Sequence, residues 1–210
     1  IPMQQHIGAC CEVLVNKGDY VYVGQVLGDT AKFVSAPIHS SVSGKVIQIK
    51  DIILYNGSKS VSIIIEPDGK QTVLPDISKP DISTKENFLK AVRSSGLTGL
   101  GGAGFPAHVK LDTKDRIPEA LIINAVECEP YITCDYRAII EEGREIVKGI
   151  ELILDKLSIS KSYIAVEDNK PAAFTLLKEL TKDEPRIETV MLSTKYPQGA
   201  EKMLIYALTG

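Results

Sequence analysis

The chain is poor in the features that mark several large classes of protein. It has no tryptophan, four phenylalanines and eight tyrosines, so we expect no aromatic platform for stacking nucleic-acid bases. A formal net charge of −3 gives no electrostatic reason to expect nucleic acid as a partner. No apolar run approaches the roughly 20 residues that span a bilayer, and no signal peptide is visible at Ile1.

The residues that usually hold metals or act as nucleophiles are few and scattered. None of the cysteines has the C-x-x-C spacing of zinc or iron–sulfur sites, and we expect free thiols in a reducing cytosol. The sequence has no H-E-x-x-H, no nucleophile elbow and no G-x-x-x-x-G-K-[ST] phosphate loop. We therefore predict no catalytic side chain and no metal ligand. The residues in question are Cys10, Cys11, Cys128, Cys134, His6, His39 and His108.

Residues 1–67 are predicted to form a small all-β domain. Short β-rich runs alternate with glycine turns, a pattern typical of a small barrel or sandwich. KGDYVYVGQVLGD and APIHSSVSGKVIQI resemble the lipoyl/biotinyl-like fold, a flattened barrel-sandwich of two sheets. Lys32 lies near the place where such carriers attach their prosthetic group, but it lacks their flanking residues. We favour an unmodified scaffold over a carrier.

Residues 68–82 are polar and proline-rich, as expected of a linker, and residues 83–210 alternate helix and strand. We predict a helix over 83–95, with Ser83 as the N-cap and Glu86 at the capping-box position. Strands over 120–124, 163–166 and 186–192 alternate with three further helices, from about 136–157, 171–180 and 199–207. This order predicts a Rossmann-like α/β domain with a parallel sheet, in which ligands bind beyond the carboxyl ends of the strands.

The segment most informative about function is GLTGLGGAGFPAHVK, residues 96–110. It contains G-x-G-x-x-G, but it follows a predicted helix rather than a strand, and Pro106 argues against a helix starting at once. A generic dinucleotide fingerprint is therefore excluded. Because glycine has no side chain to cover its backbone N–H group, such a segment can still bind a phosphate or lie against a flat ring. NAVECEP, residues 124–130, adds an amide and two carboxylates, which together predict a nucleotide or flavin site.

GLGGAGFPAHVKL followed by INAVECEPYITCDYRAIIEEG resembles the RnfC family, the peripheral subunit of the Rnf electron-transport complex. IPMQQHIGACCEVLVNKGDYVYVGQVLGD, SAPIHSSVSGKV, EDNKPAA and KYPQGAEKMLIYALTG resemble the same family, so the likeness covers essentially the whole chain. The second domain is more distantly similar to the FMN- and NADH-binding subunit of respiratory NADH:quinone oxidoreductase. A flavoprotein of cobalamin reduction is another relative, but Tyr-Ile-Thr after CEP favours RnfC.

This resemblance implies a noncovalent FMN, NAD(H) stacked over it, and reversible hydride transfer in a ferredoxin:NAD+ oxidoreductase coupled to ion translocation. Electrons would pass through two 4Fe-4S clusters in segments beyond this chain, which we expect to be a piece of a longer protein. Other Rnf subunits would be partners. The protein would sit peripherally on the cytoplasmic face of the bacterial inner membrane, with indirect membrane contact.

The resemblance also assigns roles to individual residues. Lys110 would approach the FMN phosphate or ribityl oxygens, and Asn124 would hydrogen-bond the flavin ring or ribityl chain with Glu127 nearby. Phe105, by stacking, and Glu129 would contact NAD(H). Backbone N–H groups lining the flavin would come from Gly99, Gly101, Gly102 and Gly104, and the segment closing over both ligands would contribute Tyr196, Gly199 and Glu201.

Two positions depart from the respiratory pattern: Val126 and Ala200 replace acidic residues. They leave open a second hypothesis, in which the chain is mainly a subunit-docking scaffold with a vestigial flavin site. Plainer roles also remain for individual residues. Lys110 would then be a solvated lysine, Glu127 or Glu129 would cap the helix beginning near Tyr136, and Phe105 would be a core residue.

Overall fold

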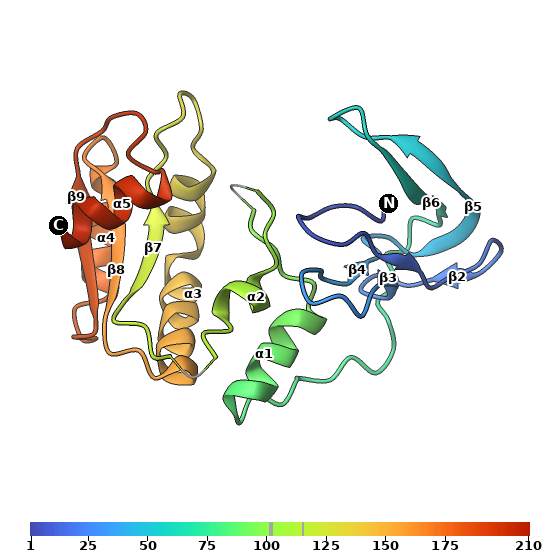
Figure 1. The fold of residues 1–210 in the computed structure, drawn as a ribbon, viewed down its shortest axis with the longest axis horizontal. Helices are drawn as coiled ribbons and strands as arrows, with labels where there is room; N and C mark the ends of the chain where they lie inside the picture. Colours follow the sequence, from blue (N-terminus) through green and yellow to red (C-terminus); the bar gives the residue numbers. More distant parts are fainter. Residues whose placement is uncertain (101–102, 115) are drawn as a thin grey trace. The chain divides into compact units, whose positions relative to one another are not determined.

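A computed structural model describes residues 1–100, 103–114 and 116–210. The chain separates into two compact units, Ile1–Asp112 and Thr113–Gly210, which are described one at a time (Figure 1). The first unit contains the β-rich region, the segment 68–82, the first helix and the described part of the glycine-rich segment. The domain boundaries expected at residues 67 and 83 remain predictions.

The first unit is built on two small antiparallel sheets, which confirms the predicted barrel-sandwich. One sheet has the order β1-β3-β4 and the other the order β2-β5-β6. The strands are β1 (Glu12–Val13), β2 (Tyr20–Val21), β3 (Val26–Asp29), β4 (Ile38–His39), β5 (Gly44–Ile53) and β6 (Lys59–Pro67). The first residues join the second sheet, because the Met3 N–H donates to the Val61 carbonyl at 2.8 Å.

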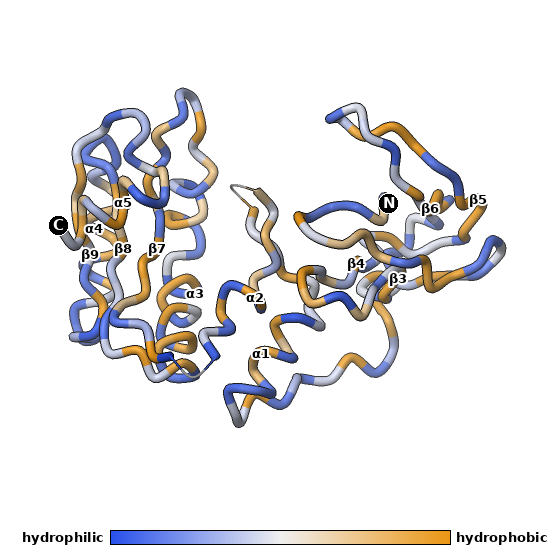
Figure 2. The backbone as a smooth tube through the Cα atoms, in the orientation of Figure 1, coloured by the Kyte–Doolittle hydropathy of each residue, from blue (hydrophilic) through white to orange (hydrophobic). Residues whose placement is uncertain are grey.

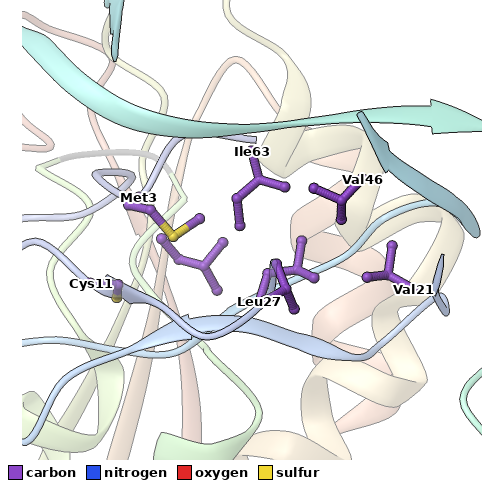
Figure 3. Packing of buried hydrophobic residues seen from close by; sticks show 8 residues of the cluster. Met3, Cys11, Val21, Leu27, Val46 and Ile63 are labelled. Carbon is purple, nitrogen blue, oxygen red and sulfur yellow. The ribbon is translucent and has the colours of Figure 1, made fainter. Parts of the chain in front are cut away.

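Apolar side chains from both sheets meet in one buried core (Figure 3). Met3, Val21, Leu27, Val46 and Ile63 are fully buried. Burying side chains of this size contributes about 1.5–3 kcal/mol each, so this cluster is the main support of the sandwich. Its remaining members are Cys11, Val15 and Ile38.

The β5–β6 hairpin is the longest paired element of the barrel. Pairing continues from Gly44 opposite Pro67 out to Ile53 opposite Lys59. The turn contains Asn56-Gly57, a strong hairpin signal that the prediction did not use. The Leu54 N–H donates to the Ser58 carbonyl at 2.8 Å and closes the turn.

Two helices follow the barrel, and both differ from expectation at their N-termini. In α1 (Lys85–Ser94) the cap is Thr84 rather than Ser83, because the Thr84 hydroxyl accepts the Asn87 N–H at 3.1 Å. The short α2 (Ala107–Leu111) starts directly after Pro106. The expectation that Pro106 opposes a helix start was therefore wrong. Proline has no N–H to lose at a helix N-terminus, and its fixed φ suits that position.

Helix α1 is attached to the barrel by a charged contact. The Arg93 guanidinium donates to both carboxylate oxygens of Asp29, at 2.7 and 3.1 Å, and to the Thr30 carbonyl at 2.8 Å. Partial burial acts to raise the pKa of Asp29, but the Arg93 hydrogen bond, the Thr30 N–H and the nearby positive charge together outweigh it and hold this pKa below its usual value. Bidentate arginine–carboxylate pairs fix orientation as well as adding energy.

The second unit is a three-stranded parallel sheet in the order β7-β8-β9 with helices between and after the strands, as predicted. Helix α3 alternates hydrophobic and hydrophilic stretches (Figure 2) and departs from helical geometry at Glu142. Helix α5 packs Leu204 against Val126 and Ala165. The elements are β7 (Leu121–Ala125), α3 (Cys134–Leu157), β8 (Ser162–Glu167), α4 (Pro171–Leu180), β9 (Ile187–Leu192) and α5 (Glu201–Thr209).

We predict that Arg93→Met lowers the free energy of unfolding of the first unit by about 2 kcal/mol, because hydrogen bonds to charged groups contribute roughly 1.5–3 kcal/mol. Urea denaturation measures the change. The matched control is Lys90→Met on the same helix, whose exposed pair with Glu86 is worth at most about 1 kcal/mol. Equal losses of unfolding free energy in Arg93→Met and Lys90→Met would contradict the conclusion that Arg93 attaches α1 to the barrel.

Candidate functional site

The carboxyl ends of β7 and β8 carry the polar residues that the sequence placed beyond a parallel sheet. Asn124, near the end of β7, is exposed, and its side-chain N–H donates to the Gly199 carbonyl at 2.9 Å. Its side-chain oxygen accepts the Val126 N–H at 3.2 Å. Asn124 and Gly199, which are 75 positions apart in sequence, are thus brought together.

Gly199 lies against the chain that leaves β7. Its N–H donates to the Cys128 sulfur at 3.4 Å. A Cβ atom at position 199 would come within 3.0 Å of the Val126 carbonyl oxygen and 3.3 Å of the Cys128 sulfur. Only glycine accommodates this approach without displacing its neighbours. Cys128 was not among the predicted site residues, and nothing in its spacing could have singled it out.

Glu127 has the plainer role that the sequence analysis left open for it. It is buried, and its carboxylate accepts the backbone N–H groups of Asp135 at 2.7 Å and Tyr136 at 3.2 Å. These N–H groups belong to the first turn of α3, where no intrahelical acceptor exists. Glu127 therefore caps α3, and whether it also lies beside a flavin stays a prediction.

Cys134 and Asp135 each place a possible metal-binding atom within 4.8 Å of a Glu127 oxygen. The Glu127 oxygens already bind the backbone of α3 and the other two side chains are exposed, so nothing beyond their proximity indicates a cation here.

Three further predicted residues are exposed in the second unit: Glu129, Tyr196 and Glu201. Tyr196 has 74% of its surface accessible. Glu201 begins α5, where a carboxylate is favoured by the helix dipole. Their exposure is compatible with ligand contact, and their individual roles stay predictions.

The described part of the glycine-rich segment forms a narrow antiparallel hairpin in the first unit. The Gly99 N–H donates to the Phe105 carbonyl and the Ala107 N–H to the Leu97 carbonyl, both at 2.9 Å. Because the Gly99 N–H is engaged, donors for a ligand must come from elsewhere in the loop. Gly101 and Gly102 lie outside the described residues.

Gly104 joins this hairpin to the barrel. Its φ is +66°, a left-handed conformation that glycine adopts at little cost, and its carbonyl accepts the Ile7 N–H at 3.2 Å. Phe105 is 36% exposed, so it is not a core residue. Lys110 is exposed on α2, which leaves its ammonium available to an anion.

Two charged residues at the same edge of the sheet were not predicted as site residues. Glu167 ends β8 and is fully buried, and Lys170 precedes α4 with 17% of its side chain exposed. The Lys170 ammonium lies 3.9 Å from a Glu127 oxygen. The sequence did contain a signal for each of these two residues. A glutamate follows the apolar run YIAV, and a lysine directly precedes the proline that starts a helix.

Comparison with known families agrees with this arrangement. Residues 92–210 match the model of the Nuo51 FMN-binding domain, and residues 1–70 match that of the RnfC barrel sandwich hybrid domain. This chain belongs to the Nuo51 FMN-binding domain family. The N-terminal match and the relatives below confirm the expected resemblance to RnfC.

Similar proteins include the corresponding subunit of the Na+-translocating ferredoxin:NAD+ oxidoreductase complex of Acetobacterium woodii, 42% identical over the whole chain and 48% of that relative. Its counterpart in the proton-translocating ferredoxin:NAD+ oxidoreductase complex of Clostridium ljungdahlii is 43% identical over the whole chain and 47% of its own length. The chain thus spans about half the length of these curated relatives.

Among solved structures, an NAD+-reducing [NiFe]-hydrogenase in the air-oxidized state matches with a TM-score of 0.52 and 25% identity. The match covers 60% of this chain and 24% of that one. Among the residues described here, no helix combines the length and the apolar character needed to cross a bilayer.

We predict that Glu127→Ala lowers the free energy of unfolding by about 1–3 kcal/mol, because it removes the α3 cap and leaves Lys170 without this carboxylate. Thermal and urea unfolding report the loss. Glu129→Ala, an exposed glutamate two positions away, should change stability by less than about 0.5 kcal/mol. If Glu129→Ala were destabilised and Glu127→Ala were not, the assignment of Glu127 as the cap of α3 would be wrong.

Proposed function

We propose that the chain is the FMN- and NAD(H)-binding part of an RnfC-type subunit in an ion-translocating ferredoxin:NAD+ oxidoreductase. The main observation is that the residues matching the FMN-binding domain include Asn124, an exposed asparagine at the carboxyl end of the parallel sheet whose side-chain amide donates to the Gly199 carbonyl. An asparagine amide has two N–H donors and this bond uses one of them, so the second can meet a ligand.

The residues of this chain fit the binding of a flavin nucleotide and its hydride donor. Exposed Lys110 provides a cation for a phosphate, and Gly104 has no side chain that would keep a ligand away from the backbone at this point. Asn124 offers an amide to the polar edge of a ring or to a ribityl hydroxyl. In the first unit, Phe105 would supply an apolar ring for stacking on a nicotinamide or adenine. In the second unit, Tyr196 is a further exposed aromatic side chain that could contact a ligand.

Bound FMN would supply the exchange between two-electron hydride transfer and one-electron transfer. The protein's task is then to hold the hydride donor against the ring and to keep water away. We further propose that two 4Fe-4S clusters outside this chain receive the electrons and that other subunits of the complex are its partners. Attachment to the cytoplasmic face of the membrane would follow through those partners.

A second function, a docking scaffold with a vestigial flavin site, is favoured by one observation. Val126 stands where the respiratory pattern has an acidic residue, and it is buried against Leu204 of α5. It therefore offers no polar contact to a flavin. Under this alternative, electron transfer by the complex would survive Lys110→Ala and Asn124→Ala, whereas deletion of the barrel would uncouple it.

We predict saturable FMN binding, followed by loss of the flavin absorbance when NADH is added. Asn124→Ala should weaken FMN binding about tenfold, the equivalent of one hydrogen bond of about 1.4 kcal/mol. Fluorescence titration of the full-length protein measures both. Asn56→Ala, in the β5–β6 turn, is the matched control and should leave the affinity unchanged. Absence of FMN binding by the full-length protein would refute the proposal.

A further inference from the structure

Glu167 is a buried carboxyl group at the end of the middle strand of the parallel sheet, and it has no exposed surface. Within the described ranges 1–100, 103–114 and 116–210, neither of its carboxyl oxygens has a partner in good hydrogen-bond geometry, although the backbone N–H of Lys195 is near enough to act on the group. Side chains alternate between the two faces of a strand, so the Glu167 side chain lies on the same face as Ala165. Ala165 packs against Leu204 of α5. An ionised carboxylate in such surroundings is costly unless it is neutralised.

Lys170 occupies a position that local rules disfavour. It is the N-cap residue of α4, and its side chain makes no capping hydrogen bond. A cation is unfavourable at this end of a helix dipole, and lysine is a poor cap. Its side chain is nevertheless mostly buried, 3.9 Å from Glu127 and 5.7 Å from the centre of the Tyr136 ring. Nearby carboxyl groups must therefore supply the interaction that offsets the cost of burying the Lys170 ammonium at this helix end.

Two carboxyl groups interact with the charge of Lys170, and they are not equivalent. Glu127 has two backbone N–H donors and the ammonium, whereas Glu167 has no such donor in hydrogen-bonding geometry among the described residues. Burial raises the pKa of Glu167, and the charges of Asp168 and Glu127 act in the same direction. The Lys170 ammonium and the backbone N–H of Lys195 oppose this rise without cancelling it.

We propose that Glu127, Lys170 and Glu167 form a proton-binding site at the carboxyl ends of β7 and β8, with the proton carried by Glu167. A neutral Glu167 leaves one ammonium facing one carboxylate, so the buried group carries no net charge. The site lies beside the Asn124–Glu129 segment. If the proposed function is correct, ligand binding there is linked to the proton on Glu167.

The stability of the protein should reveal this proton. The folded state binds the Glu167 proton more tightly than the unfolded state does, so the stability it contributes is present at low pH. That contribution is lost as pH rises from the unfolded pKa of about 4.3 through the raised folded value. Glu167→Gln, which mimics the protonated acid, should gain stability relative to the wild type over this range. Glu179→Gln, an exposed glutamate on α4, is the control and should show no such gain.

Direct titration tests the site without any ligand. In the full-length protein with 13C-labelled glutamate, the carboxyl resonance that disappears in Glu167→Gln should titrate above those of exposed glutamates. Lys170→Met should move its titration to still higher pH, whereas Lys182→Met on the surface should not. A Glu167 signal that titrates with the exposed glutamates, or one unaffected by Lys170→Met, would overturn the proposal.

A second measurement separates this proposal from the flavin assignment. FMN affinity of the wild type should change over the pH range in which Glu167 titrates, and that of Glu167→Gln should stay constant there. The same pH dependence in both proteins would overturn the link between proton and ligand. Failure of FMN to bind at any pH would refute the proposed function, while the carboxyl titration would still decide the proton site.

Discussion

The backbone N–H groups that open α3 need an acceptor, and the carboxylate of Glu127 provides it. This contact determines much of the second unit, because it holds the start of a 24-residue helix close to the end of β7. Residues 128–133 connect the end of β7 to the start of α3, and in this connection the Cys128 sulfur accepts the Gly199 N–H. The cap also places a carboxylate within reach of Lys170. A helix-capping bond thus organises one edge of the sheet within the residues that match the FMN-binding domain.

The glycine-rich segment is supported differently from the loop of a dinucleotide fold. There, a glycine loop links a strand to the helix whose N-terminus faces the phosphates. Here it links α1 to the short α2, closes on itself through Gly99 and Phe105, and is tied to the barrel through Gly104 and Ile7. Arg93 anchors α1 to the barrel as well. The barrel therefore acts as the support of this loop, which gives the N-terminal domain a structural reason to accompany a flavin-binding domain.

Periodicity and turn signals were sufficient to predict a β-rich domain followed by an α/β domain with parallel strands, because those features depend on patterns local in sequence. The errors arose where one residue decides the outcome: Thr84 rather than Ser83 caps α1, and Pro106 starts a helix rather than preventing one. The bond from Asn124 to Gly199 joins positions 75 residues apart, so no local pattern contains it. For Glu127, the family resemblance implied a place near the flavin and a helix cap was the alternative, and the cap depends on a fold in which the end of β7 approaches the start of α3.

Glu167 and Lys170 show what a search for motifs overlooks. Each breaks a local rule, since a glutamate ends an apolar strand and a lysine stands at the N-terminus of a helix. Natural sequences keep such violations mainly at functional sites, because elsewhere apolar or capping residues would be more stable. An alanine at 167 and a serine at 170 would satisfy the fold better. Glu127, Lys170 and Glu167 are all largely withdrawn from water at the carboxyl ends of β7 and β8, so the residues kept at this edge of the sheet favour a defined charge state over the greatest stability.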